Sequence, residues 1–172
     1  KLIKEKKIKA QKPLPAINDN EIPFDIPTSW EWCKLGEILN IVRGGSPRPA
    51  GDKKYYDGTI PFLKVADLTK DDAMYVDGYS YTIKEAGLYK TRYLQEETLM
   101  LTNSGATLGV PKICNFPTAF NDGIAAFIRM NISLFKPFFY YLLKSKTTWF
   151  LKEASRGQGQ PNLNTDIIGE TI

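Results

Sequence analysis

The chain is organised around one polar stretch, Ser155-Arg156-Gly157-Gln158-Gly159-Gln160-Pro161-Asn162-Leu163-Asn164. Within ten residues it offers one guanidinium, two glutamines and two asparagines, spaced by glycines. Arginine, glutamine and asparagine can hydrogen-bond base edges through two atoms at once, and glycine permits backbone angles that other residues avoid. Two interpretations follow: a loop that reads nucleobases, or a plain polar loop that ends a helix with Gly157 or Gly159 in the left-handed conformation.

The segment before this stretch, residues 134–154, is predicted to be helical because its large apolar side chains recur at helical spacing. Pro137 suits the first turn of a helix, and the β-branched pair Thr147-Thr148 predicts a break into two helices. The apolar face, expected in the core, consists of Phe135, Phe138, Phe139, Leu142 and Leu143.

Four apolar stretches predict β-strands, at residues 60–65, 98–102, 111–114 and 124–130. Pro61 places the first at a sheet edge or a strand start, because proline has no N–H to donate. Thr82 and Glu85 form a capping box, which predicts a short helix ending near Gly87.

The alternation of Trp30 and Trp32 predicts an extended segment with both indoles in the core. A helical turn through Leu35, Ile38 and Leu39 is expected after it. With helices and strands both present, the fold class is α+β: a single mixed sheet with a C-terminal aromatic helical region.

The composition suits one folded domain. The chain has 172 residues, 42% of them hydrophobic, which argues against disorder. There is no histidine, so the commonest general base and most zinc chemistry are missing. Cys33 and Cys114 form no CxxC motif; they are expected to be buried thiols in a reducing cytoplasm, without a metal or a cofactor.

The formal charge of +4 is concentrated at one end. Residues 1–12 carry six lysines and one glutamate, so the other 160 residues hold 17 basic and 18 acidic groups. A nucleic-acid role must therefore rest on local asymmetry. Basic residues outnumber acidic ones four to one in residues 43–54 and in residues 144–156, whereas residues 67–77 carry four acids and one lysine.

Residues 1–20 are predicted to lie outside the main domain, which we expect at residues 21–172. The first twelve residues suggest either the tail of a helix that began upstream or a disordered basic arm. Prolines at positions 13, 15, 23 and 27 then predict an extended linker.

Residues 43–51 form a Gly/Pro loop that carries Arg43 and Arg48. The loop lacks the phosphate-binding GxxxxGK[ST] pattern and the GxGxxG spacing. A loop that presents arginine to an external polyanion fits better, and a plain surface loop is the alternative.

Taken in order, several blocks of the chain resemble the target recognition domain of the specificity subunit of type I restriction-modification systems. The match begins with Pro27-Thr28-Ser29-Trp30-Glu31-Trp32 and covers roughly residues 22–172. No single block is specific, but the ordered set is. The other blocks are residues 34–38, 44–47, 56–64 with Asp67, 82–87, 101–109, 120–124 and 157–163.

The resemblance implies a DNA-binding module without catalytic activity. A specificity subunit carries two such domains, each reading one half of a split double-stranded DNA sequence, and long helices set their spacing. It would direct modification subunits, which methylate adenine with S-adenosylmethionine, and restriction subunits, which cleave with ATP. Residues 1–12 would then be the end of a spacer helix, and the helix expected after Ile172 is absent from this chain.

The candidate DNA-binding residues fall into two groups. We expect cations to position the phosphate backbone and amides or guanidinia to read base edges. The first group is Arg43, Arg48, Lys53 and Lys54, with Lys64 as a further DNA-binding candidate; the second is Asn103, Arg156, Gln158, Gln160 and Asn162. Alternatively, the shared blocks are scaffold, with residues 157–163 packed against a spacer helix or a modification subunit.

Three other functions compete with this interpretation. The chain could be the recognition half of a fused restriction-methylation enzyme, or a docking module whose polar loops meet protein. It could also be a small nucleotide-dependent enzyme that uses the loops at Gly45 or Gly105. The sequence does not reveal the DNA target or whether this is the first or second recognition domain.

Overall fold

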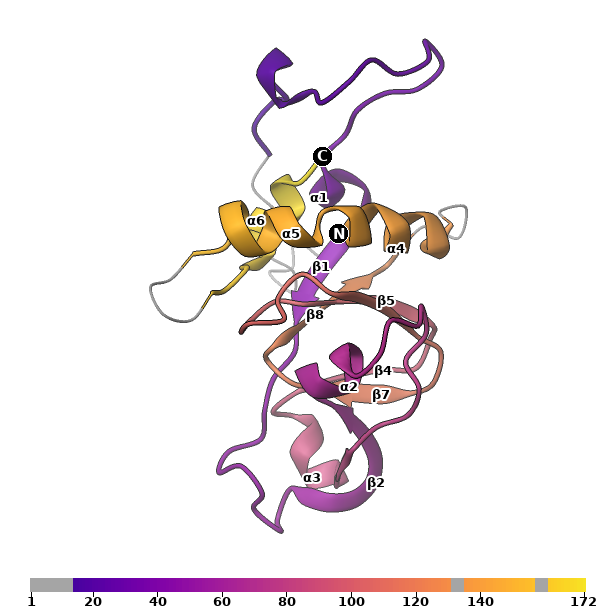
Figure 1. The fold of residues 1–172 in the computed structure, drawn as a ribbon. Helices are drawn as coiled ribbons and strands as arrows, with labels where there is room; N and C mark the ends of the chain where they lie inside the picture. The colour runs from indigo at the N-terminus through magenta and orange to yellow at the C-terminus, as the bar shows by residue number, and fades with distance from the viewer. Residues whose placement is uncertain (1–13, 131–134, 157–160) are drawn as a thin grey trace, which may run out of the picture.

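The computed structural model describes residues 14–130, 135–156 and 161–172 (Figure 1). The strands form two four-stranded sheets, with orders β1-β8-β5-β6 and β3-β2-β7-β4. The strands are β1 (Asn40–Arg43), β2 (Tyr56–Leu63), β3 (Tyr81–Ile83), β4 (Arg92–Leu94), β5 (Thr98–Thr102), β6 (Pro111–Cys114), β7 (Thr118–Phe120) and β8 (Ile124–Ile128). The helices are α1 (Leu35–Ile38), α2 (Val65–Thr69), α3 (Glu85–Leu88), α4 (Lys136–Ser145), α5 (Thr147–Trp149) and α6 (Thr165–Glu170), with a π-helical turn at Phe150–Ala154.

The first sheet is the centre of the core because both of its faces are covered. Every residue of β5 is buried. Successive side chains of a strand point to opposite faces, so Leu99 and Leu101 pack with the helices whereas Met100 packs toward the second sheet. In β8, Phe127 and Ala126 divide in the same way. The three central residues of β5, Leu99 to Leu101, are all apolar because both faces of the strand are covered, which is why its sequence predicted it well.

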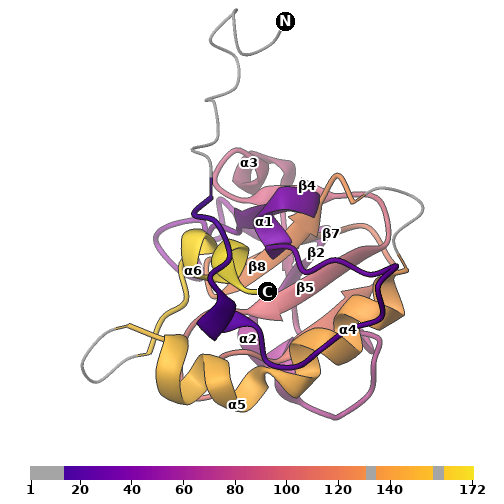
Figure 2. The same cartoon turned by 90° about the horizontal axis from the view of Figure 1, so that it is seen from above.

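Helices cover one face of the first sheet (Figure 1). Phe139 and Leu143 of α4 and Phe150 of the π-helical turn are buried against it. Seen from above, α1 and α6 lie side by side at the end of this helical layer (Figure 2). The N–H of Leu35 in α1 donates to the carbonyl of Thr171, just after α6, at 2.8 Å.

The second sheet is mixed. Its strand β2 runs antiparallel to β3 and parallel to β7. The expectation that Pro61 marks an edge or a strand start is wrong, because β2 is an inner strand. Pairing with β7 is confined to Phe62 and Leu63, so Pro61 has only β3 as a paired neighbour and its missing N–H is tolerated.

The predicted α+β class is confirmed, but the strands divide into two sheets instead of one, and only the second is mixed. Strands at 98–102 and 111–114 are confirmed, and the predicted strand from 124 ends at Ile128. The predicted helix break is also confirmed, since α4 ends at Ser145 and α5 begins at Thr147.

The predicted capping box at Thr82 is wrong. Thr82 lies in β3, and helix α3 begins at Glu85, after Lys84. Pairing with the second sheet overrides the local signal, because Ile83 is fully buried and pairs with β2.

Two of the five residues of the predicted apolar face, which we call the aromatic stripe, lie outside the core. Phe139 and Leu143 are buried as expected, but Phe135 is 69% exposed and Phe138 49% exposed. The helical layer is one helix thick, so α4 buries one face and exposes the other. Trp30, expected in the core, is 63% exposed.

The two thiols are free. Cys114 is buried as expected, and its burial raises the pKa of the thiol to about 11. Cys33 is only half-buried, and partial desolvation also raises the pKa of its thiol. Neither environment favours a reactive thiolate.

The predicted N-terminal helix tail lies outside the described residues, and the boundary near residue 20 stays a prediction. Within the described part, Lys34 is buried and its ammonium lies 3.8 Å from Glu21. No helix in the described ranges is both long and apolar enough to cross a membrane.

Phe150→Ala is expected to lower the free energy of unfolding by about 3–5 kcal/mol, because it leaves a cavity beneath the helical layer. The matched control, Phe135→Ala, removes an exposed ring and is expected to change stability by less than about 0.5 kcal/mol. Urea unfolding of both variants checks the prediction. If the two variants lose the same free energy of unfolding, the placement of Phe150 in the core and of Phe135 at the surface is wrong.

Candidate nucleic-acid interface

Four loops meet at one end of the first sheet, where β1 and β5 end and β8 begins. We call them the loop cluster. Main-chain hydrogen bonds join them: the Gly45 N–H donates to the Phe120 carbonyl at 3.1 Å, and the Asn103 N–H donates to the Gly123 carbonyl at 2.9 Å. The loop cluster comprises residues 43–48, 103–109, 121–123, 156 and 161–162.

Two glycines allow the first loop to approach so closely. A Cβ on Gly44 would lie 2.5 Å from the carbonyl oxygen of Phe120 and closer still to that of Asn121. A Cβ on Gly45 would collide with the carbonyl oxygen of Lys90. No side chain fits at either position without separating the backbones, so glycine is required there for space.

The polar stretch folds back on itself at its base. The N–H groups of Arg156 and Asn162 donate to each other's carbonyls, at 3.0 and 2.9 Å. The carbonyl of Pro161 accepts from the N–H of Gly105 at 3.1 Å, which ties the stretch to the loop after β5. Arg156 is exposed and Asn162 half-buried.

Asp122 holds the Gly/Pro loop of residues 43–51, which we call the basic loop. Arg43 donates from Nε to the Asp122 carbonyl at 2.5 Å, and Ser46 donates from Oγ to its carboxylate at 2.6 Å. The guanidinium of Arg48 lies 3.8 Å from the same carboxylate while its side chain stays 70% exposed. Both predicted phosphate-binding arginines therefore lie at the loop cluster, held by one acidic turn.

A polar hollow of about 320 Å³ opens between these loops. Its size and lining suit a polar group from a ligand better than an apolar one. The residues that line it are Arg43, Ser104, Asn121, Asp122, Gly123 and Asn162.

Asn103 does not belong with the base-reading candidates. Its side chain is fully buried, so a base edge cannot reach it. Its main chain instead holds two loops, because its N–H donates to Gly123 and its carbonyl accepts from Leu163 at 2.8 Å. Neither atom of its amide has a partner among the described residues.

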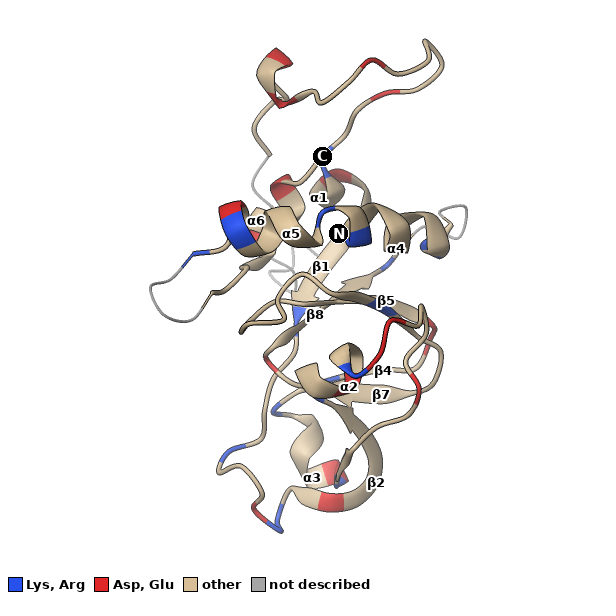
Figure 3. Cartoon of the chain, viewed as in Figure 1, with Lys and Arg blue, Asp and Glu red and all other residues tan. Residues whose placement is uncertain are grey.

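The other predicted residues are not gathered at the hollow. Lys53 and Lys54 lie in the loop before β2. Figure 3 shows blue segments on this loop, at the end of the second sheet that is away from the helical layer. Lys64 precedes α2, and its ammonium lies 3.2 Å from the centroid of the Tyr81 ring. Gln158 and Gln160 lie outside the described residues, so their readout role stays a prediction.

Our sequence reasoning missed Ser104, Asn121 and Asp122 as site residues. Asn121-Asp122-Gly123 is a turn-forming sequence between two apolar strands. That signal predicts a turn, but it does not reveal that three other loops converge on it.

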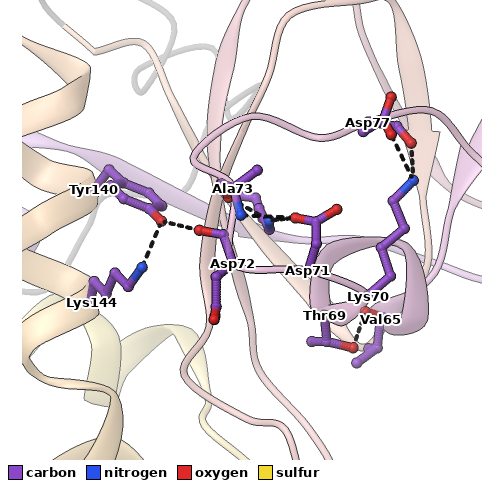
Figure 4. A network of polar contacts seen from close by, with 10 residues as sticks. Val65, Thr69, Lys70, Asp71, Asp72, Ala73, Asp77, Tyr140 and Lys144 are labelled. Atoms are coloured by element: carbon purple, nitrogen blue, oxygen red, sulfur yellow. Dashed lines mark hydrogen bonds and ion pairs between the residues drawn. The ribbon is translucent and has the colours of Figure 1, made fainter.

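The acidic segment of residues 67–77, by contrast, has a structural role (Figure 4). The buried ammonium of Lys112 donates to Asp71 at 2.5 Å and to the carbonyl of Ala73. The hydroxyl of Tyr140 in α4 donates to the carbonyl of Asp72 at 3.5 Å. These contacts tie the segment to β6 and α4.

A sequence profile described as the type I restriction modification DNA specificity domain matches residues 27–171. The chain is 56% identical over 110 residues, 60% of its length, to the type I restriction enzyme EcoEI specificity subunit of Escherichia coli. It is 30% identical over 148 residues, 84% of its length, to the MjaIX specificity subunit of Methanocaldococcus jannaschii. These alignments span only 18% and 34% of the two relatives.

The fold is also similar to a solved structure, that of the HsdS subunit from Thermoanaerobacter tengcongensis. The TM-score is 0.63 at 19% sequence identity, and the match covers 86% of this chain and 33% of the other. At this identity the likeness concerns the fold alone.

Gly44→Ala is expected to destabilise the protein by about 1–3 kcal/mol, the usual cost of overpacking. A Cβ on Gly169 in α6 would have no neighbour closer than 3.6 Å. Gly169→Ala is therefore a matched control, expected to be neutral or slightly stabilising. Denaturant midpoints of the two variants measure the difference, and a neutral Gly44→Ala would contradict the close approach.

The Asp71–Lys112 contact is expected to give a specific pH dependence. The hydrogen bond from Lys112 lowers the pKa of Asp71 below the ordinary 3.8. A lowered folded pKa means that the stabilisation is present above the unfolded pKa and is lost as the pH falls through the folded one. Relative to Asp71→Asn, the wild-type denaturant midpoint is therefore expected to fall more steeply below about pH 4. If the denaturant midpoints of wild type and Asp71→Asn instead fall in parallel as the pH is lowered, the expected pH dependence is wrong.

Proposed function

This chain belongs to the type I restriction modification DNA specificity domain family, and from that premise we propose that it recognises double-stranded DNA. In this proposal it reads one half of a split target sequence in the cytoplasm. It carries no catalytic group of its own and directs the modification and restriction subunits of the system to their site.

One observation carries the proposal: the loop cluster brings side chains suited to base edges together with exposed arginines. Asn162 and Asn121 line the polar hollow, and Arg156 is exposed beside Asn162. Amide and guanidinium groups make two-point hydrogen bonds to adenine and guanine. We assign base readout to Arg156 and Asn162, and phosphate contacts to Arg43 and Arg48.

Arg48 also explains how the acidic turn is compatible with DNA. Its guanidinium is mostly exposed and its distance to Asp122 is long for an ion pair. Such pairs contribute little in water, so the arginine can move to a phosphate at small cost. The body of the domain is near neutral, which predicts modest affinity for DNA, because counterion release scales with the phosphates contacted.

Selection from a randomised duplex library at low salt tests the proposal, first with the chain alone and then with modification subunits added. A short enriched motif whose binding weakens steeply with salt is the expected result. If neither selection yields a motif, sequence recognition by this chain is wrong.

The Arg156→Ala and Asn162→Ala variants are each expected to relax the motif at one position, with a loss of about 1–3 kcal/mol for the preferred base. Gln95→Ala is the matched control, since Gln95 is an exposed amide past the end of β4 that lies away from the loop cluster. Affinities for the selected motif and its single-base variants give the measurement. If the base preference is unchanged in both variants, neither Arg156 nor Asn162 reads a base.

A protein-docking role has an observation of its own. An apolar groove of about 430 Å³ runs between α1 and α4, and Trp30 and Phe138 are exposed along it. Exposed apolar surfaces of this kind mark protein contacts. This role is supported if the chain binds a modification subunit with an affinity that does not change with salt, and if Phe138→Ser abolishes that binding.

A further inference from the structure

The lysines of the domain divide into two classes. Four form ion pairs: Lys34 with Glu21, Lys70 with Asp77, Lys112 with Asp71 and Lys136 with Glu97. Among the described residues, eight other lysines have no carboxylate within ion-pairing distance, and four of these eight lie around α3. We call them the lysine patch: Lys53, Lys54, Lys84 and Lys90.

The lysine patch is assembled from two segments that are distant in sequence. The ammonium of Lys84 donates to the carbonyl of Lys53 at 2.6 Å. The ammonium groups of Lys54 and Lys90 lie 5.4 and 5.7 Å from the centroid of the same ring, that of Tyr55. Four positive charges thus share one small region, although like charges repel and solvated lysines have no reason to gather.

Two tyrosines support this arrangement. The Tyr55 and Tyr89 rings meet edge to face with centroids 6.4 Å apart, and their hydroxyls lie 3.4 Å from each other. Tyr55 is buried, whereas Tyr89 is 72% exposed. The hydrogen bond with Tyr55, and then the ammonium of Lys90, lower the pKa of the Tyr89 hydroxyl, as expected in a positive potential.

One end of the lysine patch contacts the loop cluster. Gly45 packs against the carbonyl of Lys90, and a Cβ on Gly87 would lie 3.4 Å from the ring of Pro47. The Lys84 N–H donates to the Tyr55 carbonyl at 2.8 Å. The basic loop is therefore the backbone link between the polar hollow and the lysine patch.

We propose that the lysine patch binds the phosphate backbone of the duplex whose bases face the loop cluster, beyond the half-site itself. The inference rests on the proposed function and adds a surface to it. Three acidic residues lie close to these lysines in sequence, Asp52, Asp57 and Glu85, so four lysines against three carboxylates leave a net charge of +1. Asp52 is already engaged, since its carboxylate accepts from the Lys54 N–H at 2.8 Å.

Phosphate, rather than base, is the expected ligand of this surface. Lysine ammonium groups act as point charges without the two-point geometry that reads a base. Contacts of this kind position the protein on the duplex and carry no sequence information. The patch should therefore affect affinity and its salt dependence but leave the preferred sequence unchanged.

The double variant Lys84→Gln/Lys90→Gln tests the proposal. Binding of the chain to a duplex of about 30 base pairs is measured over a range of NaCl concentrations, by fluorescence anisotropy. Each lost phosphate contact makes the slope of log K against log salt shallower by about 0.9, so a change of roughly 1.8 is expected. The matched control, Lys70→Gln/Lys136→Gln, removes the same charge from lysines that are paired with carboxylates, and its slope should stay as in wild type.

Three results would overturn the proposal, and they are distinguishable. If the slope is unchanged in the patch variant while wild type binds DNA with a sequence preference, the lysine patch does not bind phosphate and the proposed function still holds. Unchanged DNA binding together with weaker binding of a modification subunit assigns the patch to an acidic protein surface. Absence of DNA binding by wild type, with and without modification subunits, removes the proposed function as well.

Discussion

The chain crosses from one sheet to the other at the turn formed by residues 121–123, and the arrangement of the molecule depends on that crossing. β7 ends in the second sheet at Phe120, and β8 begins in the first at Ile124. The carbonyl of Phe120 accepts from the Gly45 N–H and from the Thr91 hydroxyl, the latter at 2.7 Å. One carbonyl thereby fixes the basic loop and the start of β4 against the turn.

This constraint places the polar residues. Because β1 and β5 both lie antiparallel to β8, their ends meet the crossing turn at the same end of the sheet. Main-chain hydrogen bonds then join the loop after β5 to the polar stretch. Arg156 and Asn162 are therefore positioned by backbone contacts, which leaves their side chains available for a ligand. The acidic segment is anchored instead to β6 by the buried Lys112. It is anchored to α4 by Tyr140, whose hydroxyl faces Asp72 (Figure 4). Cations and amides therefore gather on one part of the surface, and the acids near α4 have a structural partner.

How much of this could be predicted from sequence differs between elements. β5 and β8 were predictable because strands buried on both faces are continuously apolar. The capping box at Thr82 failed because burial of Ile83 in the second sheet outweighs a local end signal. The number of sheets was not predictable, since a strand's pattern says that it is buried but not which strand it pairs with. Phe135 and Phe138 of the aromatic stripe were misplaced because helical spacing does not reveal how many layers cover a helix.

The candidate site was predictable only in part. Arg43, Arg48, Arg156 and Asn162 were expected to bind DNA, and the fold brings all four to the loop cluster. Asn103 carries the same amide group but lies inside, where it holds the loops together. Residue type indicated the chemistry. Exposure, however, depends on contacts between loops that are distant in sequence, such as that of Arg43 with Asp122, 79 residues away.

Amide hydrogen exchange of the chain, with and without a duplex carrying its selected motif, tests the central claim most directly. The account predicts slower exchange on DNA binding at the amides of residues 103–105, 121–124 and 162–163, with no change along α4. Protection confined to α4 and the apolar groove, with the loop cluster unchanged, would contradict it.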